Sequence, residues 1–114
     1  MANTFKLVTK ANVTSSDVIY TPNAVTTVIL GLILGNTTSS QVTSTVSLAS
    51  STGNRAGDNN ESNQTVELIT DAPIPAGSSL ELLAGNKVVM EDNDALSVSA
   101  TGSTDVALSI MEIS

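Results

Sequence analysis

The hydrophobic and polar residues of this chain alternate over short stretches, which is the two-residue period of a half-buried β-strand. Between residues 71 and 100, apolar residues recur two apart, and polar turn sequences separate the pairs. Elsewhere Val, Ile and Thr recur at alternating positions, and we find no convincing 3.6-residue period of a helix. The pattern predicts strands at residues 4–10, 16–21, 24–34, 41–49, 65–70, 79–83, 87–90, 95–100 and 105–113.

The number and spacing of these strands indicate the fold class. The chain has 114 residues, enough for one domain, 1–114, and not for two. Eight or nine short strands with turns every ~8–12 residues are typical of a β-sandwich. We therefore predict an all-β, single-domain antiparallel β-sandwich of about eight strands, with jelly-roll and immunoglobulin-like topologies both open. Pro73, Pro75 and Gly77 predict an extended crossing from one sheet to the other.

The strand predicted at residues 24–34 is apolar on both sides. Strict alternation places Ile29 and Ile33 together on one side, and Leu32 and Leu34 on the other. Such a strand is either central and covered twice, or it presents one side to another molecule. Ile29 and Ile33 are therefore candidate interface residues.

The N-terminal segment combines two cations with two large apolar side chains, and it allows two interpretations. Residues 1–10 could form an N-terminal arm that a neighbouring subunit holds in place, with Phe5, Lys6, Leu7 and Lys10 as interface residues. Alternatively the segment is an ordinary edge strand of the sandwich, and its lysines protect that edge against aggregation.

A long polar segment lies between the fourth and fifth predicted strands. Residues 50–64 contain almost no apolar side chain but several Gly, Asn and Asp residues, so we predict a loop. Fifteen residues is long for a loop in a compact domain. Such loops are either mobile tips or contacts for a partner, and the sequence leaves both open.

Composition excludes several classes of function. The net charge is −7, so the clustered cations that phosphate-backbone binding needs are missing, and we expect no nucleic-acid partner. The longest apolar run, residues 24–35, is too short to span a bilayer as a helix, so we expect no membrane partner. The chain has no cysteine and no histidine, which removes thiolate metal sites and the commonest general base.

The acidic group Glu91, Asp92 and Asp94 is the strongest candidate for a metal site, because calcium takes oxygen ligands. The spacing lacks the glycine and the distal glutamate of an EF-hand loop, however. Asp and Asn in a hairpin turn accept local backbone hydrogen bonds, and we favour that interpretation. No carboxylate pair flanks an expected cleft, and no glycine-rich phosphate loop occurs. We predict no catalytic, cofactor-binding or metal-binding residues, and no enzymatic activity.

Several phrases of the sequence resemble small virion structural proteins of tailed bacteriophages. The resemblance covers nearly the whole chain, but it has no catalytic signature. This chain departs from the family pattern at residues 91–94, where an Ala-Gly-Asp turn is expected, and in its longer loop at 50–64. The phrases are "ANTFK", "YTPNAVTTVILGLILGNTT", "TDAPIPAGSSLELLAGNKVVMEDND", "LSVSA" and "ALSIMEIS".

The resemblance implies a coat component present in many copies, and a capsid decoration or cement protein fits best. It implies a location on the virion after assembly in the host cytoplasm, with the major capsid protein or other virion proteins as partners. It also favours a homo-oligomer, a trimer above all, because decoration proteins often sit on three-fold positions. A neck, tail or baseplate component is the alternative within the virion. A glycan-binding or adhesin module is the alternative from another class, for which Phe5 and Tyr20 are the only aromatic side chains.

Overall fold

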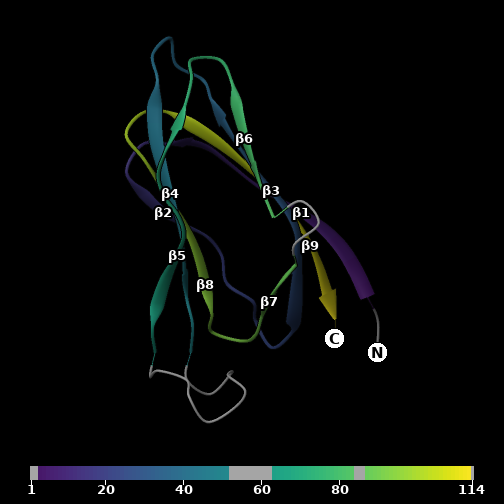
Figure 1. The fold of residues 1–114 in the computed structure, drawn as a ribbon. Coiled ribbons are helices and arrows are strands. Elements are labelled where there is room, and N and C mark those ends of the chain that lie inside the picture. Colours follow the sequence, from purple (N-terminus) through teal and green to yellow (C-terminus); the bar gives the residue numbers. More distant parts are fainter. Residues whose placement is uncertain (1–2, 52–62, 84–86, 114) are drawn as a thin grey trace.

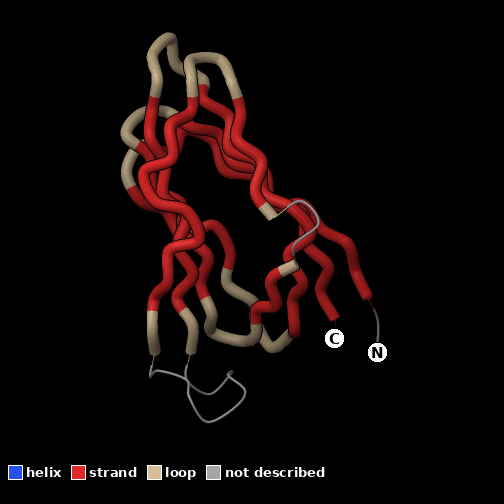
Figure 2. The backbone as a smooth tube through the Cα atoms, in the orientation of Figure 1, coloured by secondary structure: helices blue, strands red, loops and turns tan. Residues whose placement is uncertain are grey.

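The computed structural model describes residues 3–51, 63–83 and 87–113, and these fold as two packed β-sheets (Figures 1 and 2). The predicted all-β antiparallel sandwich is confirmed, and every predicted strand position holds an observed strand. No described segment forms a helix that is long and apolar enough to cross a membrane. The strands are β1 (Asn3–Val13), β2 (Ser16–Tyr20), β3 (Thr26–Asn36), β4 (Val42–Ala49), β5 (Thr65–Ile74), β6 (Ser79–Leu82), β7 (Val88–Met90), β8 (Ala95–Ala100) and β9 (Thr104–Ile113).

The strand order decides between the two topologies that the sequence left open. Sheet A has the order β1-β9-β3-β6, with β7 also paired to β3, and sheet B has the order β2-β8-β4-β5. Strand β9 occupies one edge of β3. The two short strands β6 and β7 share the other edge of β3 and together fill a single strand position. The resulting two sheets of four positions have the arrangement of a jelly roll. In an immunoglobulin sandwich the first two strands lie in the same sheet, whereas here β1 and β2 lie in opposite sheets.

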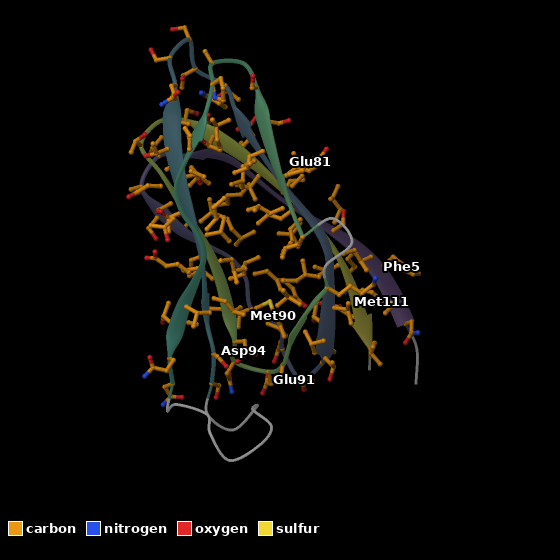
Figure 3. All side chains as sticks on the ribbon, viewed as in Figure 1. Phe5, Glu81, Met90, Glu91, Asp94 and Met111 are labelled. Carbon is orange, nitrogen blue, oxygen red and sulfur yellow. The ribbon has the colours of Figure 1, made fainter. Side chains whose placement is uncertain are left out.

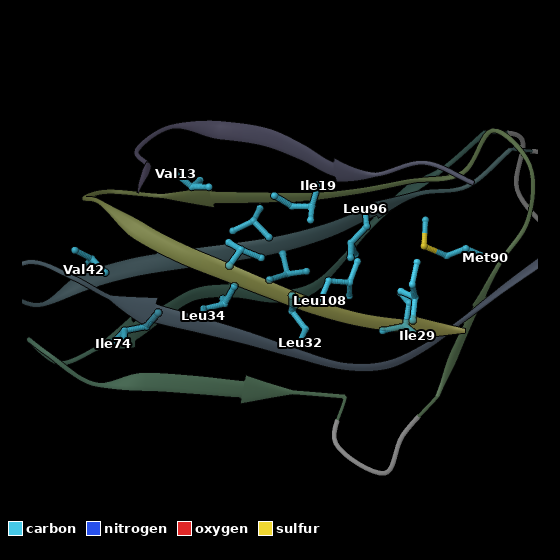
Figure 4. Packing of buried hydrophobic residues seen from close by; sticks show 14 residues of the cluster. Val13, Ile19, Ile29, Leu32, Leu34, Val42, Ile74, Met90, Leu96 and Leu108 are labelled. Carbon is cyan, nitrogen blue, oxygen red and sulfur yellow. The ribbon is translucent and has the colours of Figure 1, made fainter. Parts of the chain in front are cut away.

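The core lies between the two sheets and is aliphatic apart from Met90 (Figure 4). Each strand contributes alternate side chains, so that burial excludes apolar surface from water along the whole sandwich. On β9, for example, Val106, Leu108 and Ile110 are buried, as the alternation predicted. The other buried members are Val13, Ile19, Ile29, Leu32, Leu34, Val42, Val46, Ile74, Leu96 and Val98.

Strand β3 departs from strict alternation, and one sequence-based prediction is wrong for this reason. The register against β9 shifts between Ile29 and Gly31, which inserts one extra residue as a β-bulge. Before the bulge the odd-numbered residues of β3 face the core, and after it the even-numbered residues do. Ile29 therefore lies in the core on the same side as Leu32, whereas Ile33 points outward and is 45% exposed.

The crossing between the sheets comes later in the chain than predicted. Strand β5 continues to Ile74 and pairs with β4 through Pro73, which is tolerated because β5 is an edge strand. The chain passes to sheet A only in the turn at 75–78, where the Ser78 N–H donates to the Pro75 carbonyl at 3.0 Å. The buried Asn36 amide fixes this end by donating to the Ile74 carbonyl at 2.9 Å.

The N-terminal segment, for which the sequence allowed two interpretations, forms an edge strand. Residues 3–10 belong to β1, which pairs with β9 from Asn3↔Ile113 to Lys10↔Val106 as an edge strand of sheet A. Of the two alternatives, this is the edge strand and not the separate arm.

Most of the loop predicted at 50–64, residues 52–62, lies outside the described residues. At the base of this loop the Ser50 N–H donates to the Gln64 carbonyl at 2.9 Å.

Candidate interaction surface

The outer side of sheet A carries a row of apolar side chains that crosses four strands. Phe5 on β1 pairs with Met111 on β9, Met111 pairs with Val28 on β3, and Val28 pairs with Val89 on β7. Cross-strand partners project to the same side of a sheet, so these four side chains form one continuous row. Figure 3 shows Phe5 and Met111 close together, with Met90 pointing between the sheets.

Water reaches much of this row. Phe5 is 71% exposed and Val89 is 58% exposed, while Val28 and Met111 are half-buried between them. Leu7 and Ile33 lie on the same side of the sheet and are 64% and 45% exposed. Large apolar side chains that gather on one exposed face mark an interaction surface more often than scattered ones do. We call this set the apolar face: Phe5, Leu7, Val28, Ile33, Val89 and Met111.

One end of the apolar face is hollowed. A depression of about 340 Å³ lies beside Ile33, where Gly35 and Ala107 provide no bulk. Thr9 and Asp105 lie at its margin. The lining is mainly apolar, and its charged residues are Lys10 and Asp105.

The outer side of sheet B has the opposite character. Val42, Ser44 and Val46 on β4, and Leu96 and Val98 on β8, are buried, so the residues that alternate with them project outward. Those residues bear hydroxyl groups and pair across the strands, as in Thr45↔Ser99 and Ser47↔Ser97. We call this set the hydroxyl face: Thr43, Thr45 and Ser47 on β4, and Ser97 and Ser99 on β8. The two broad sides of the molecule therefore differ: sheet A presents the apolar face, with Glu81 beside Ile33, and sheet B presents the hydroxyl face.

The six residues predicted as interface candidates do not stay together. Phe5, Leu7 and Ile33 belong to the apolar face. Lys6 and Lys10 alternate with them on β1 and project to the opposite side of that strand, toward sheet B. Ile29 is fully buried in the core because of the bulge in β3. Val28, Val89 and Met111 complete the face and were not predicted from the sequence.

A polar network closes the sandwich beneath β1. The Lys6 ammonium lies 2.7 Å from Glu112 Oε1, and the Tyr20 hydroxyl donates to Glu112 Oε2 at 2.6 Å. Since that hydroxyl has one proton, the Thr27 hydroxyl donates to Tyr20 Oη at 2.7 Å. Burial, and then the hydrogen bond to Glu112, raise the pKa of Tyr20 to about 12. The hydrogen bonds from Lys6 and Tyr20 lower the pKa of Glu112 below its usual range.

The acidic group at residues 91–94 forms the turn between β7 and β8. The Glu91 N–H donates to Asp94 Oδ2 at 2.9 Å, and the Asp94 N–H donates to the Glu91 carbonyl at 3.1 Å. Asp92 Oδ1 accepts the Ala24 N–H at 2.8 Å, and Asp94 Oδ1 accepts the Ser51 N–H at 2.8 Å. These carboxylates accept the backbone hydrogen bonds that we expected of a turn, and they also join it to neighbouring loops.

Comparison with known proteins gives no family assignment. No family model matches the chain, and no curated protein matches it. Among solved structures, a chain from Bacillus endospore appendages, described as a novel family of disulfide-linked pili, is similar with a TM-score of 0.45 and 13% identity, covering 96% of this chain and 85% of that one. A chain of the infectious bursal disease virus Gx strain is similar with a TM-score of 0.37 and 11% identity, covering 96% of this chain and 37% of that one. Because both TM-scores lie below 0.5, we base no functional inference on either likeness.

Proposed function

We propose that this chain is a structural protein of a bacteriophage virion, a capsid decoration or cement protein that binds the assembled head and stabilises it. The observation that carries the proposal is the apolar face of sheet A, which stands opposite the hydroxyl face of sheet B. The assignment to a phage virion rests on the resemblance of the sequence. The proposed role is mechanical, and the chain acts by binding and not by catalysis.

The apolar face provides the binding energy that this role requires. Removing one large apolar side chain from water contributes about 1.5–3 kcal/mol when burial is complete. The four most exposed members of the face, Phe5, Leu7, Ile33 and Val89, retain much of this energy for a partner. A protein that binds only the assembled shell stabilises that shell by mass action, and many copies multiply weak contacts.

The rest of the molecule suits a position on the outside of a particle. Once the apolar face is docked, the hydroxyl face is directed away from the shell and stays hydrated. The net charge of −7 keeps the copies soluble before they bind. Jelly rolls occur in viral capsid domains, and they also occur in lectins and cupins, so the fold is compatible with the role without selecting it.

Copy number tests the assignment directly. In purified particles of the phage that encodes this chain, a decoration protein should approach the abundance of the major capsid protein. An abundance far below that level would contradict the proposal and favour a neck, tail or baseplate component.

Binding to shells that lack the protein tests the surface. Val89→Asp places a charge in the apolar face, and Val18→Asp is its matched control, because both valines are 58% exposed and Val18 lies on sheet B. We expect Val89→Asp to weaken binding at least ~10-fold, which corresponds to a loss of ~1.4 kcal/mol or more of binding free energy. Val18→Asp should bind like the wild type. Equal binding by both variants would show that another surface makes the contact.

A further inference from the structure

The exposed edges of the two sheets differ in how well they resist pairing with another chain. Edge strands are normally protected by shortness, bulges, proline or charge. β6 and β7 are four and three residues long. β2 has five residues and a register shift between Val18 and Tyr20. β5 pairs with two register shifts and contains Pro73. These three edges therefore have the protection that is usual in a monomeric protein.

The edge of β1 has far less protection. This strand has 11 residues, and its register against β9 is unbroken from Asn3 to Lys10. Among the described residues it pairs with β9 alone, so its other side carries a row of backbone N–H and C=O groups without a strand partner. Inward-pointing lysines can protect an edge. The charge of Lys6 is paired with Glu112 at 2.7 Å, which leaves Lys10 as the second lysine on the inward side of the strand. Phe5 and Leu7 add exposed apolar surface beside this edge.

We propose that β1 pairs antiparallel with β1 of a second copy, about a two-fold axis at Leu7. A second copy is the favoured occupant because the strand is complementary to itself in this register. Leu7 lies opposite Leu7 of the second copy, Phe5 lies opposite its Thr9, and Lys6 lies opposite its Val8. Seven residues, 4–10, then pair in each copy, which uses almost all of the regular part of the strand.

The charges on β1 select this register over its neighbours. In an isologous antiparallel pair, a shift moves the axis by one residue at a time. An axis at Lys6 would place two Lys6 side chains opposite each other, and an axis at Val8 would place Lys6 opposite Lys10; like charges directly opposite destabilise a pair. An axis at Phe5 avoids this repulsion, but it pairs only five described residues, 3–7. Within the regular part of β1, residues 3–10, an axis at Leu7 therefore gives the longest pairing in which no cation faces another.

The pairing has a geometric consequence for the apolar face. A two-fold axis perpendicular to the sheet keeps the outer sides of both sheets A on the same side of the dimer. The two apolar faces then adjoin at Phe5 and Leu7 and form one surface of twice the extent. The dimer would form in solution without any shell, so this inference goes beyond the proposed function and does not depend on it. It also differs from the trimer that the resemblance favours.

Charge exchange at Leu7 tests both the pairing and its register. We expect sedimentation equilibrium of the wild-type protein to give twice the 11.6 kDa monomer mass. Leu7→Lys alone and Leu7→Glu alone should each be monomeric, because like charges would meet on the axis. An equal mixture of the two variants should form a heterodimer, since opposite charges then meet. Val18→Lys, on the bulged edge strand β2, is the matched control and should remain dimeric.

The same measurements can overturn the inference. A wild-type protein that stays monomeric up to millimolar concentration, or that has a trimeric mass, contradicts β1 pairing. A mixture of the Leu7 variants that stays monomeric contradicts the axis at Leu7. Circular dichroism and the Tm of each variant establish that loss of the dimer is not loss of the fold, which is expected to persist because Leu7 is 64% exposed. Shell binding by a monomeric wild type would leave the proposed function standing while this inference fails.

Discussion

The Tyr20 hydroxyl donates a hydrogen bond of 2.6 Å to Glu112 Oε2, and this bond joins the two sheets across 92 positions of the sequence. Tyr20 ends β2 in sheet B, and Glu112 lies on β9 in sheet A. Thr27 and Lys6 complete the network from β3 and β1, so four strands meet at one carboxylate and one phenol. The network satisfies polar groups that the sandwich partly removes from water, and its protonation should be measurable.

Tyr20 is the only tyrosine in a chain without tryptophan, so an ultraviolet titration reports on this residue alone. We expect a midpoint at about 12 in the folded protein, against ~10 in urea, because burial and the hydrogen bond to Glu112 disfavour the phenolate. In Glu112→Gln the midpoint should fall but stay above the unfolded value, since burial is the larger cause. A folded-state midpoint near 10 would mean that the phenol is not held as described.

The raised pKa of Tyr20 also predicts a loss of stability in alkali. The folded protein retains the phenolic proton more strongly than the unfolded chain, so this contribution is complete below pH ~10 and is lost as the pH rises toward 12. Tyr20→Phe should lack this dependence and should lose about 1–3 kcal/mol at neutral pH, because Glu112 and Thr27 each lose a partner. Denaturant unfolding of both proteins between pH 7 and ~12 measures the difference.

Glu112 predicts the opposite dependence in acid. Its pKa is lowered in the folded protein, first by the hydrogen bond from Lys6, so the folded state binds this proton less strongly than the unfolded chain. The stabilisation is therefore present above the unfolded pKa of ~4.3 and is lost as the pH falls through the folded value. Lys6→Met should reduce the acid dependence, while Lys10→Met, on the same side of β1, should leave it unchanged. Equal acid profiles for the two variants would contradict a specific role of the Lys6–Glu112 pair.

Local pattern was sufficient to locate the strands of this fold, but not to decide which side chains face outward. Alternation and runs of β-branched residues located all nine strand positions, because most of these strands place one side in the core and keep the two-residue period over most of their length. The bulge after Ile29 reverses the phase of β3, and a one-residue slip exchanges the two sides of a strand. Gly31, an isolated glycine inside a strand, was the signal in the sequence that could have revealed it.

The pattern of hydrophobic and polar residues could not predict contacts between distant parts of the chain. The row from Phe5 through Met111 to Val28 depends on two registers, which bring together both ends of the chain and its middle. The bond between Tyr20 and Glu112 likewise depends on how the two sheets stack. One sequence contains no information on such pairings until the topology is known. The difference between a jelly roll and an immunoglobulin sandwich was open for the same reason.

The bulge in β3 predicts that two isoleucines four positions apart respond differently to the same substitution. Ile29→Asp should cost more than ~4 kcal/mol and prevent folding, because it buries an unpaired carboxylate in the hydrophobic core. Ile33→Asp should change the free energy of unfolding by less than ~1 kcal/mol, because Ile33 is 45% exposed, yet it should weaken binding to the shell. Thermal unfolding of both variants tests the phase of β3, and similar Tm losses would contradict the bulge.

Deletion of residues 1–10 distinguishes an integral edge strand from a separable arm. β1 pairs with β9 over the whole of 3–10, and Val8 packs against the core, so the deletion removes a ladder, uncovers β9 and leaves Glu112 without Lys6. We therefore expect a strongly lowered Tm or an unfolded chain. The double variant Phe5→Ser, Leu7→Ser is the control: it keeps the strand and its hydrogen bonds, and because both side chains are largely exposed it should change the Tm little while it weakens association. If the deleted protein instead keeps the Tm of the wild type, β1 contributes nothing to the sandwich and the segment acts as an arm.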